Sequence, residues 1–205
     1  MPVTTVADTT DRTRKAEQAD RTRANLMQVA RTLFAERGYA GTATEEVVQQ
    51  AGVTRGALYH HFRDKRDLFE AVFIEVQEEM RDRISAASRN AEGPPWDKFR
   101  AGFDVYLDHS MDPAVRRILL LDAPSVLGWE RWREVDAALG LLRNGLTTLQ
   151  SLGQVDPRMG IEEIAHLLRG VASEGAHMIA LASDPTETRR AVGVAVDRLL
   201  ESVQA

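Results

Sequence analysis

The hydrophobic positions of this chain repeat with a helical period along most of its length. Apolar stripes with steps of three and four residues run from Leu26 to Phe34 and from Leu68 to Met80. Later segments continue this pattern, and none shows the regular alternation that is typical of a half-buried strand. The pattern predicts an all-α protein of about nine helices, with a small three-helix head and a larger helical body.

Two short helical patterns between residues 42 and 62 meet at a glycine. The first has an apolar side and ends at Gly52, which accepts a left-handed backbone. Thr54 is placed to N-cap the second, whose Leu58 and Phe62 lie on one face. Such a pair is a helix-turn-helix, which places its second helix in the major groove of DNA.

Residues beside these patterns supply start and stop signals for helices. Thr42 can N-cap the first short helix, and Glu45 can close a capping box with it. Asp64 is placed to N-cap a longer helix that ends before Gly93-Pro94-Pro95. An N-cap followed by proline recurs at Asp112-Pro113 and Asp184-Pro185.

The chain divides into three parts on this interpretation. Residues 1–19 are polar and aperiodic, which predicts a flexible arm, and residues 20–64 form the helix-turn-helix head. Residues 65–205 form the regulatory body, with a linking helix over 65–90. Basic residues of the arm either reach a neighbouring groove of bound DNA or belong to a solvated tail; they are Arg12, Arg14 and Lys15. The later helices are expected at 96–111, 113–121, 125–152, 160–183 and 185–203.

The head contains several motifs at fixed spacings: Leu33-Phe34-x-x-x-Gly38-Tyr39, Thr42, Ala51-Gly52-Val53-Thr54-Arg55-Gly56, Leu58-Tyr59-x-His61-Phe62 and Lys65-x-x-Leu68. In these motifs it resembles the DNA-binding domain of the tetracycline-repressor (TetR) family of transcriptional regulators. Two positions depart from the family pattern, because Ala43 replaces a hydroxyl residue and Thr44 an aliphatic one. A weaker resemblance, to the ligand domain of one subgroup, covers Asp122 to Trp129.

This resemblance implies that the second short helix contacts double-stranded DNA. Arg55 either holds guanine O6 and N7 or contacts a phosphate, and Gly56 lets the backbone approach closely. Tyr59, His61 and Lys65 match positions that meet phosphates. The hydroxyl of Thr42 either meets a phosphate or serves only as a cap. The predicted DNA-contacting residues are Thr42, Thr54, Arg55, Gly56, Tyr59, His60, His61 and Lys65.

The charged residues are distributed as expected for a protein with a DNA-binding head. The whole chain carries a net charge of -5. Residues 1–66 hold 11 basic and 8 acidic side chains, a balance of +3, whereas residues 67–205 hold 15 basic and 23 acidic ones, a balance of -8. A basic head on an acidic body suits a protein that presents one end to phosphates.

Other functional classes find little support in the residues. The chain has no cysteine, which excludes disulfides and thiolate chemistry, and no apolar run long enough for a membrane span or a signal peptide. No strained nucleophile turn or glycine-rich phosphate loop indicates an enzyme. His60 and His61 are adjacent and point about 100° apart on a helix, so they chelate poorly. We expect a cytoplasmic protein with no catalytic site, metal or cofactor.

The last two predicted helices are the expected homodimer interface, because helix-turn-helix proteins read two half-sites as dimers. Together they would form a four-helix interface with the partner chain; the alternative is an ordinary internal core. The apolar band on them consists of Ile161, Ile164, Ala165, Leu168, Val171, Ala172, Gly175, Met178 and Ile179, followed by Val192, Val196, Leu199 and Val203.

A small-molecule effector site is expected in the body as a mostly apolar cavity with a few polar groups. These features predict a ligand-responsive regulator of a palindromic operator, and the resemblance favours a repressor. The alternative is a helical adaptor or ligand-binding protein whose helix-turn-helix contacts protein. Candidate ligand contacts are Phe103, Tyr106, His109, Met111, Trp129, Trp132, Glu174 and His177, with Asp122 and Arg133 as charged partners.

Overall fold

The computed structural model describes residues 6–135 and 137–205 of the chain. It divides into two compact units, Met1–Val72 and Phe73–Ala205. Within the described residues all regular secondary structure is helical, and the only strand-like pairing is an isolated bridge between Val155 and Gln204. The predicted all-α class, with a helix-turn-helix head and a larger helical body, is confirmed.

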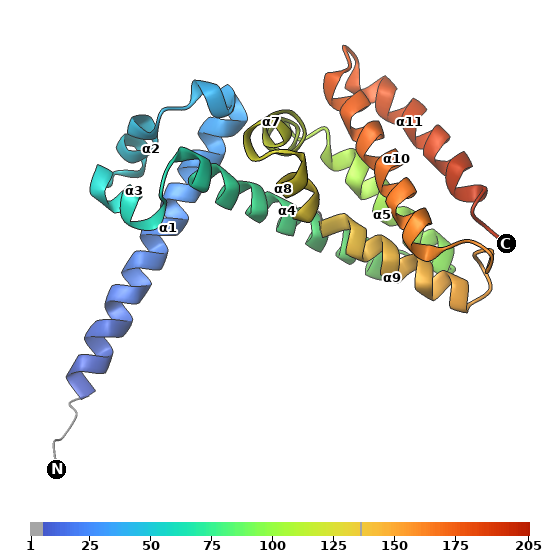
Figure 1. Cartoon of the computed structure of the whole chain (residues 1–205), viewed down its shortest axis with the longest axis horizontal. Helices are drawn as coiled ribbons and strands as arrows, with labels where there is room; N and C mark the ends of the chain where they lie inside the picture. Colours follow the sequence, from blue (N-terminus) through green and yellow to red (C-terminus); the bar gives the residue numbers. More distant parts are fainter. Residues whose placement is uncertain (1–5, 136) are drawn as a thin grey trace. The chain divides into compact units, whose positions relative to one another are not determined.

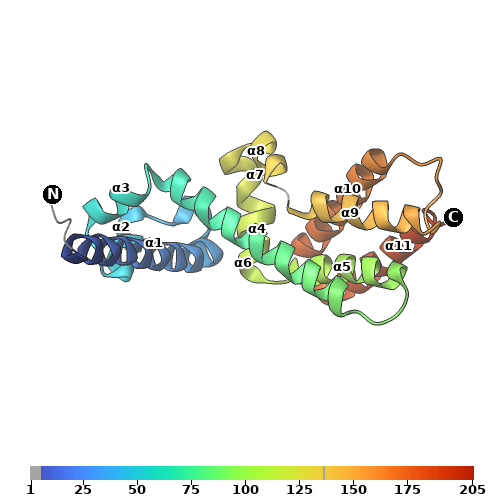
Figure 2. The same ribbon diagram turned by 90° about the horizontal axis from the view of Figure 1, so that it is seen from below.

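The N-terminal unit is built on one long helix. In it α2 and α3 lie alongside α1 (Figures 1 and 2). Gly38 breaks α1 with a positive φ of 72°, a conformation that glycine adopts readily. The helices are α1 (Val6–Gly41), α2 (Thr44–Ala51), α3 (Arg55–His61) and the beginning of α4 (Lys65–Asn90).

The predicted aperiodic arm is wrong for residues 6–19, because they form the first turns of α1. This segment has no apolar stripe, but its Arg, Lys, Glu, Gln and Ala residues all have high intrinsic helix propensity. Helix α1 therefore continues past the part of it that packs in the core. Lys15 and Arg14 are exposed on this extension, while the side chain of Arg12 lies outside the described residues.

Apolar side chains from all four helices fill the core of the N-terminal unit. Phe34 packs edge-on against Phe69 with ring centroids 5.1 Å apart, and Tyr39 lies against both rings. Because Phe69 belongs to α4, the compact unit extends beyond the boundary predicted at residue 64. The buried residues of this core are Leu26, Met27, Ala30, Leu33, Phe34, Val47, Leu58, Phe62, Leu68, Phe69 and Val72.

Most of the predicted caps are confirmed. Gly52 ends α2 in the left-handed region at φ 65° and ψ 31°. The hydroxyl of Thr54 accepts the N–H of Ala57 at 3.2 Å, and the carboxylate of Asp64 accepts the N–H of Asp67 at 2.8 Å.

The capping box predicted for α2 is wrong. Helix α2 begins at Thr44, and Ala43 occupies the N-cap position without a side-chain bond. The hydroxyl of Thr42 instead donates to the Gly38 carbonyl at 2.9 Å. The break at Gly38 leaves this carbonyl next to Thr42, and a buried threonine satisfies it.

The second unit is a helical body in which α10 is central. Helix α10 packs against α9, α11 and α5, and Figure 1 shows α10 and α11 running side by side. Asp112 and Asp184 cap α6 and α11 as predicted. The body continues α4 with α5 (Pro95–His109), α6 (Pro113–Val115), the π-helical segment η1 (Arg116–Asp122), α7 (Ala123–Leu127), α8 (Trp129–Glu134), α9 (Ala137–Ser151), α10 (Ile161–Leu181) and α11 (Pro185–Glu201).

The region from 113 to 134 departs from the predicted helices. The sequence predicts a gap between the helices over 113–121 and 125–152, but η1 continues directly into α7 through Pro124, and the sharp break comes at Gly128 with φ 88°. A π-helical register shifts the backbone hydrogen bonds by one residue, so a proline can follow without a clash inside an α-helix. The predicted helix over 125–152 is consequently divided into parts of α7, α8 and α9.

This change of register deprives the Leu119 carbonyl of a backbone donor. Ala123, its α-helical partner, donates to Ile118 instead, and Pro124, its π-helical partner, has no N–H. The indole Nε1 of Trp132 donates to this carbonyl at 3.0 Å from α8. The buried side chain of Trp132 therefore fastens α8 to η1.

We expect Trp132→Phe to lower the free energy of unfolding by about 1–3 kcal/mol, because it leaves a buried carbonyl without a donor. Urea unfolding followed by circular dichroism measures the change. Trp129→Phe is the matched control, since Trp129 is 57% exposed, and it should change stability by less than about 0.5 kcal/mol. Equal losses in the two variants would contradict the bond's proposed importance.

Candidate nucleic-acid interface and body cavity

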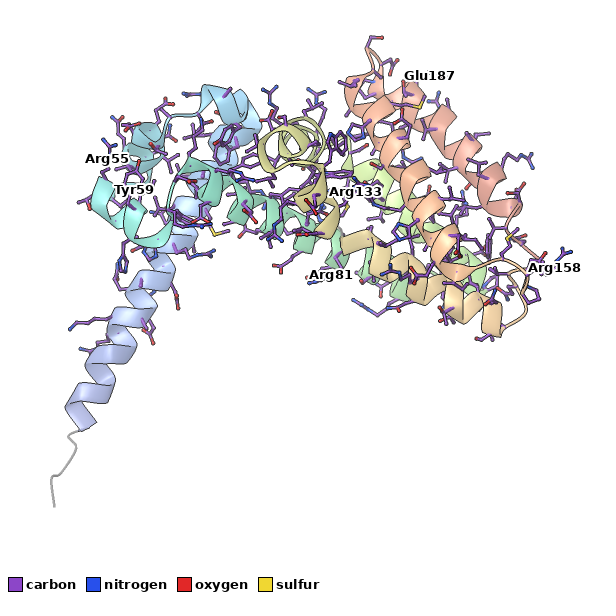
Figure 3. The ribbon with its side chains drawn as sticks, in the orientation of Figure 1. Arg55, Tyr59, Arg81, Arg133, Arg158 and Glu187 are labelled. Atoms are coloured by element: carbon purple, nitrogen blue, oxygen red, sulfur yellow. The ribbon has the colours of Figure 1, made fainter. Side chains whose placement is uncertain are left out.

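Helix α3 separates its side chains into a buried and an exposed set. Leu58 is fully buried and Phe62 is 3% exposed, so the apolar side of the helix is held in the core of the unit. Tyr59 is 42% exposed and Arg55 has 70% of its side chain in solvent. Figure 3 shows both of these side chains on the outer side of the helix. The predicted contact residues of α3 thus share an exposed surface.

Arg55 lies within a small polar cluster on this surface. Its guanidinium carbon is 5.5 Å from the centroid of the Tyr59 ring, and its Nη1 is 3.5 Å from the Glu45 carboxylate of α2. Both partners are exposed to water, so the ion pair is weak and readily exchanged for a phosphate or a base edge. The aromatic ring supports the guanidinium without occupying its N–H groups.

Lys65 is held at the first position of α4. Its Nζ atom lies 4.3 Å from the centroid of the Tyr39 ring, which in turn packs against Phe69. Burial raises the pKa of Tyr39, so this ring stays neutral at physiological pH. The ammonium of Lys65 is therefore positioned by the core of the unit near the end of α3.

His60 and His61 close the C-terminal end of α3. Their ring centroids are 5.2 Å apart; His60 is exposed, whereas His61 is half-buried. Desolvation, followed by the positive charges of His60 and Arg23, lowers the pKa of His61. At neutral pH His61 is a neutral imidazole that can donate an N–H to a phosphate. Among the described side chains no group of three or more His, Asp or Glu residues could hold a metal ion.

The remaining predicted residues differ in their exposure. Thr54 is exposed at the start of α3, while Thr42 is 2% exposed and uses its hydroxyl on a backbone carbonyl. A methyl group added at Gly56 would meet nothing closer than the Thr54 hydroxyl at 3.9 Å. Packing within the chain therefore does not require glycine at position 56. A molecule that binds closely against α3 would explain why this position has no side chain.

Arg63 is an additional cation that sequence reasoning missed. It lies in the turn between α3 and α4, has 84% of its side chain in solvent, and bonds the Asp67 carboxylate at 3.0 Å. Hydrogen bonds from the side chain and the backbone N–H of Arg63 lower the pKa of Asp67. Arg63 lies in the sequence between His61 and Lys65, two residues predicted to contact phosphates, and this position could have identified it as a further DNA-contacting residue.

The body contains a cavity of about 50 Å³ between α4, α5, α9 and α10. Of the predicted ligand contacts, Phe103 and Tyr106 line this cavity. Trp132 lines a separate, smaller recess, whose walls also include Tyr106. The cavity residues that were not among the predicted ligand contacts are Ile84, Ser88, Phe99, Gly102, Ala138, Leu141, Leu142, Arg169 and Ala172.

Five other predicted ligand contacts lie outside this cavity. His109 is buried, and His177 is half-buried, with ring nitrogens 2.8 Å and 3.2 Å from two backbone carbonyls. Met111, Trp129 and Glu174 are exposed. Of the two suggested charged partners, Asp122 is paired with Arg117 at 3.3 Å, and Arg133 is exposed (Figure 3).

The apolar band predicted on α10 and α11 proves to have two faces. Most of its residues are buried in the core of the body itself, which was the alternative to a dimer interface. They include Ile164, Ala165, Leu168, Ala172, Gly175 and Ile179. A second face stays in solvent and bounds a groove of about 620 Å³ between the two helices. Met178 and Leu199 are exposed and line this groove, and Leu167, Leu181 and Val194 are further exposed apolar residues of α10 and α11.

The geometry so far defines a helix-turn-helix protein with a helical body, and comparison with known proteins identifies its family. Residues 26–72 match the model of bacterial regulatory proteins of the tetR family, and residues 96–203 match the tetracyclin repressor-like C-terminal domain. The chain belongs to the TetR family of transcriptional regulators. This family is non-enzymatic, and its members bind DNA and small-molecule effectors.

Individual relatives agree with this assignment. The crystal structure of a TetR-family transcriptional regulator from Pectobacterium atrosepticum is 34% identical, with a TM-score of 0.81 over 92% of this chain and 97% of that one. The Transposon Tn10 TetC protein of Escherichia coli is 29% identical over 54% of this chain and 55% of its own length. The HTH-type transcriptional regulator AcrR of Shigella flexneri is 44% identical over 28% and 26%. The chain thus spans about half, or less, of the length of these two curated relatives.

Thr54→Ala should destabilise the N-terminal unit by about 1 kcal/mol, because it removes the only side-chain cap of α3. The change is measured as a shift of the urea midpoint at constant slope. Thr54→Ser keeps the accepting hydroxyl and should retain nearly all of the stability. A loss as large in the serine variant would show that the cap is not the cause.

Proposed function

We propose that this chain is a ligand-responsive transcriptional repressor that binds a palindromic operator as a homodimer. Family membership makes it a helix-turn-helix regulator homologous to repressors. The observation that carries the proposal is the exposed polar surface of α3, where Arg55, Tyr59 and His60 project from a helix whose other side is buried. Lys65 begins the next helix beside it.

The exposed surface has the composition that groove recognition needs. The planar guanidinium of Arg55 can bond guanine O6 and N7 together, which distinguishes bases. Tyr59, His61 and Lys65 offer an O–H, a neutral N–H and an ammonium to phosphates, which fix the orientation of the helix. Thr42 is the least suited of the proposed contacts, because its hydroxyl is buried and already bonded.

Dimerisation follows from the needs of recognition and from the second face of α10 and α11. One short helix reads few base pairs, so two heads about 34 Å apart are needed for a specific site. Leu167 and Leu181 are 71% and 70% exposed on α10, and the stripe between them includes Val171 and Met178. An apolar surface of this kind favours burial against a second copy of the same surface.

Regulation requires a ligand that distinguishes two states of the dimer. The cavity in the body supplies a place for the ligand, and α4 belongs both to the N-terminal unit and to the cavity wall through Ile84 and Ser88. A ligand that binds better when the heads are wrongly spaced shifts the population away from DNA. The largest possible shift equals the difference in its affinity for the two states.

Selection of binding sites from a random duplex library, at two salt concentrations, tests the proposed function. We expect enrichment of one palindrome with half-sites about one helical turn apart, and affinity that falls steeply with salt. Absence of binding even at low salt would overturn the proposal and favour an adaptor whose helix-turn-helix contacts protein.

Arg55→Ala should weaken binding to the selected palindrome by roughly 10- to 100-fold and relax its preference at one position of each half-site. Arg158→Ala is the matched control, since this arginine lies in the body and has 88% of its side chain in solvent. Fluorescence anisotropy with labelled duplexes measures both. Uniform weakening on every sequence would assign Arg55 to a phosphate, and unchanged binding would remove it from the interface.

Leu167→Glu should convert the dimer into monomers, because it places a charge within the exposed apolar stripe of α10. Light scattering after size-exclusion chromatography gives the mass directly. Leu152→Glu serves as the control, since Leu152 is 54% exposed just after α9 and belongs to neither α10 nor α11. If both variants keep the mass of the wild type, α10 does not carry the interface.

A further inference from the structure

We propose that Glu45 of α2 is a positioning residue for DNA recognition, which directs Arg55 to the edge of a guanine and away from phosphates. This inference rests on the proposed function, in which Arg55 contacts either a base or a phosphate. It derives from the ion pair between these two side chains and from the different partner of the neighbouring Glu46.

The carboxylate of Glu45 is held beside Arg55 on the exposed surface of the helix-turn-helix. Its Oε1 atom lies 3.5 Å from Nη1 of Arg55, and its Oε2 atom accepts the hydroxyl of Thr44 at 3.2 Å. Glu45 is the second residue of α2 and Arg55 is the first residue of α3. The ion pair therefore joins the N-terminal turns of the two helices.

Glu45 carries a negative charge at neutral pH. Hydrogen bonds from its own backbone N–H and from the Thr44 hydroxyl lower its pKa, and the positive charge of Arg55 acts in the same direction. The N-terminus of α2 also favours an anion. A fixed negative charge beside the proposed DNA contacts weakens the general attraction to phosphates, so its role has to lie in discrimination.

A phosphate at Arg55 would share one cation with the Glu45 carboxylate. In water the repulsion between the two anions is small, but docking of DNA excludes water and strengthens this repulsion. The O6 and N7 atoms of guanine accept hydrogen bonds without a formal charge, so a guanine edge does not meet it. Glu45 therefore disfavours one of the two contacts that are open to Arg55 and tolerates the other.

The guanidinium of Arg55 has enough donors for the carboxylate and a base together. Nη1 is the atom that pairs with Glu45, and the ring of Tyr59 lies 5.5 Å from the guanidinium carbon, where it contacts the face and takes no N–H. The N–H groups of Nε and Nη2 can bond the two acceptors of guanine, which a bidentate contact requires. Arg55 can thus keep its partner while it reads a base.

The adjacent Glu46 has a different role. Its carboxylate pairs with Arg37 of α1 at 2.5 Å, so it fastens α2 to α1. Both glutamates lie in the first turn of α2 and have the same formal charge. A change of Glu46 to glutamine therefore removes the same charge from the same turn without touching the contact with Arg55, which makes it the matched control.

Fluorescence anisotropy of the full-length Glu45→Gln variant tests the proposal on three duplexes. They are the selected palindrome, the palindrome substituted at the position that Arg55→Ala relaxes, and an unrelated sequence. We expect the variant to bind the unrelated duplex roughly 3- to 10-fold more tightly and to lose roughly 5- to 20-fold of its discrimination between the first two. Its affinity should also fall more steeply with salt, because Arg55 then contacts a phosphate.

Two further variants show whether the charge of Glu45 acts, and whether it acts through Arg55. Glu46→Gln should leave the discrimination unchanged, and Glu45→Asp, which keeps the charge, should retain most of it. In the Arg55→Ala background Glu45→Gln should no longer change the discrimination, because the residue through which it acts is absent.

The outcomes separate the role of Glu45 from the proposed function. Equal effects of Glu45→Gln and Glu46→Gln, unchanged discrimination in Glu45→Gln, or an effect that persists in the Arg55→Ala background would overturn the role of Glu45 alone. An Arg55→Ala variant that relaxes no position would do the same, since Arg55 would then contact a phosphate. A wild-type protein that discriminates no sequence would overturn the proposed function, and the role of Glu45 with it.

Discussion

A helix of seven residues cannot hold its shape in water, and the proposed function of this chain depends on such a helix. Burial of Leu58 and Phe62 in the core of the N-terminal unit supplies the missing stability. Gly52 fixes the turn before α3, and Thr54 caps its first N–H groups. The exposed side of α3 is therefore held in place although its own residues contribute little to the stability of the helix. A surface that is already ordered loses less entropy when it binds DNA.

Helix α10 has the corresponding role in the body. Its inner face forms the core with α5, α9 and α11, and its outer face keeps Leu167 and Leu181 in solvent. Between these faces Arg169 reaches the cavity and stacks on Trp132. One helix therefore carries part of the body's core and the proposed dimer surface, and it also borders the body cavity.

Local signals allowed much of this to be predicted. Glycine, Asp-Pro pairs and helical periodicity located Gly52, Asp112, Asp184 and the helices they bound, because each acts within a few residues. The N-cap of α2 was mispredicted because two threonines lie within three positions, and the Gly38 carbonyl that engages Thr42 is exposed only by the kink in α1. Arg169 and the bond of Trp132 to η1 could not be found in the sequence, since they depend on helices meeting in space and on a π-helical register. Periodicity also could not separate the two apolar faces of α10.

Amide hydrogen exchange of the full-length protein, with and without duplex DNA at low salt, tests the central claim most directly. If the exposed side of α3 binds DNA, exchange should slow in peptides that cover residues 54–66 and stay unchanged in α9. The comparison uses the protein as it exists and reports on every segment at once. Slower exchange confined to the body, or none in α3 while the complex forms, would contradict the assignment of α3 as the recognition helix.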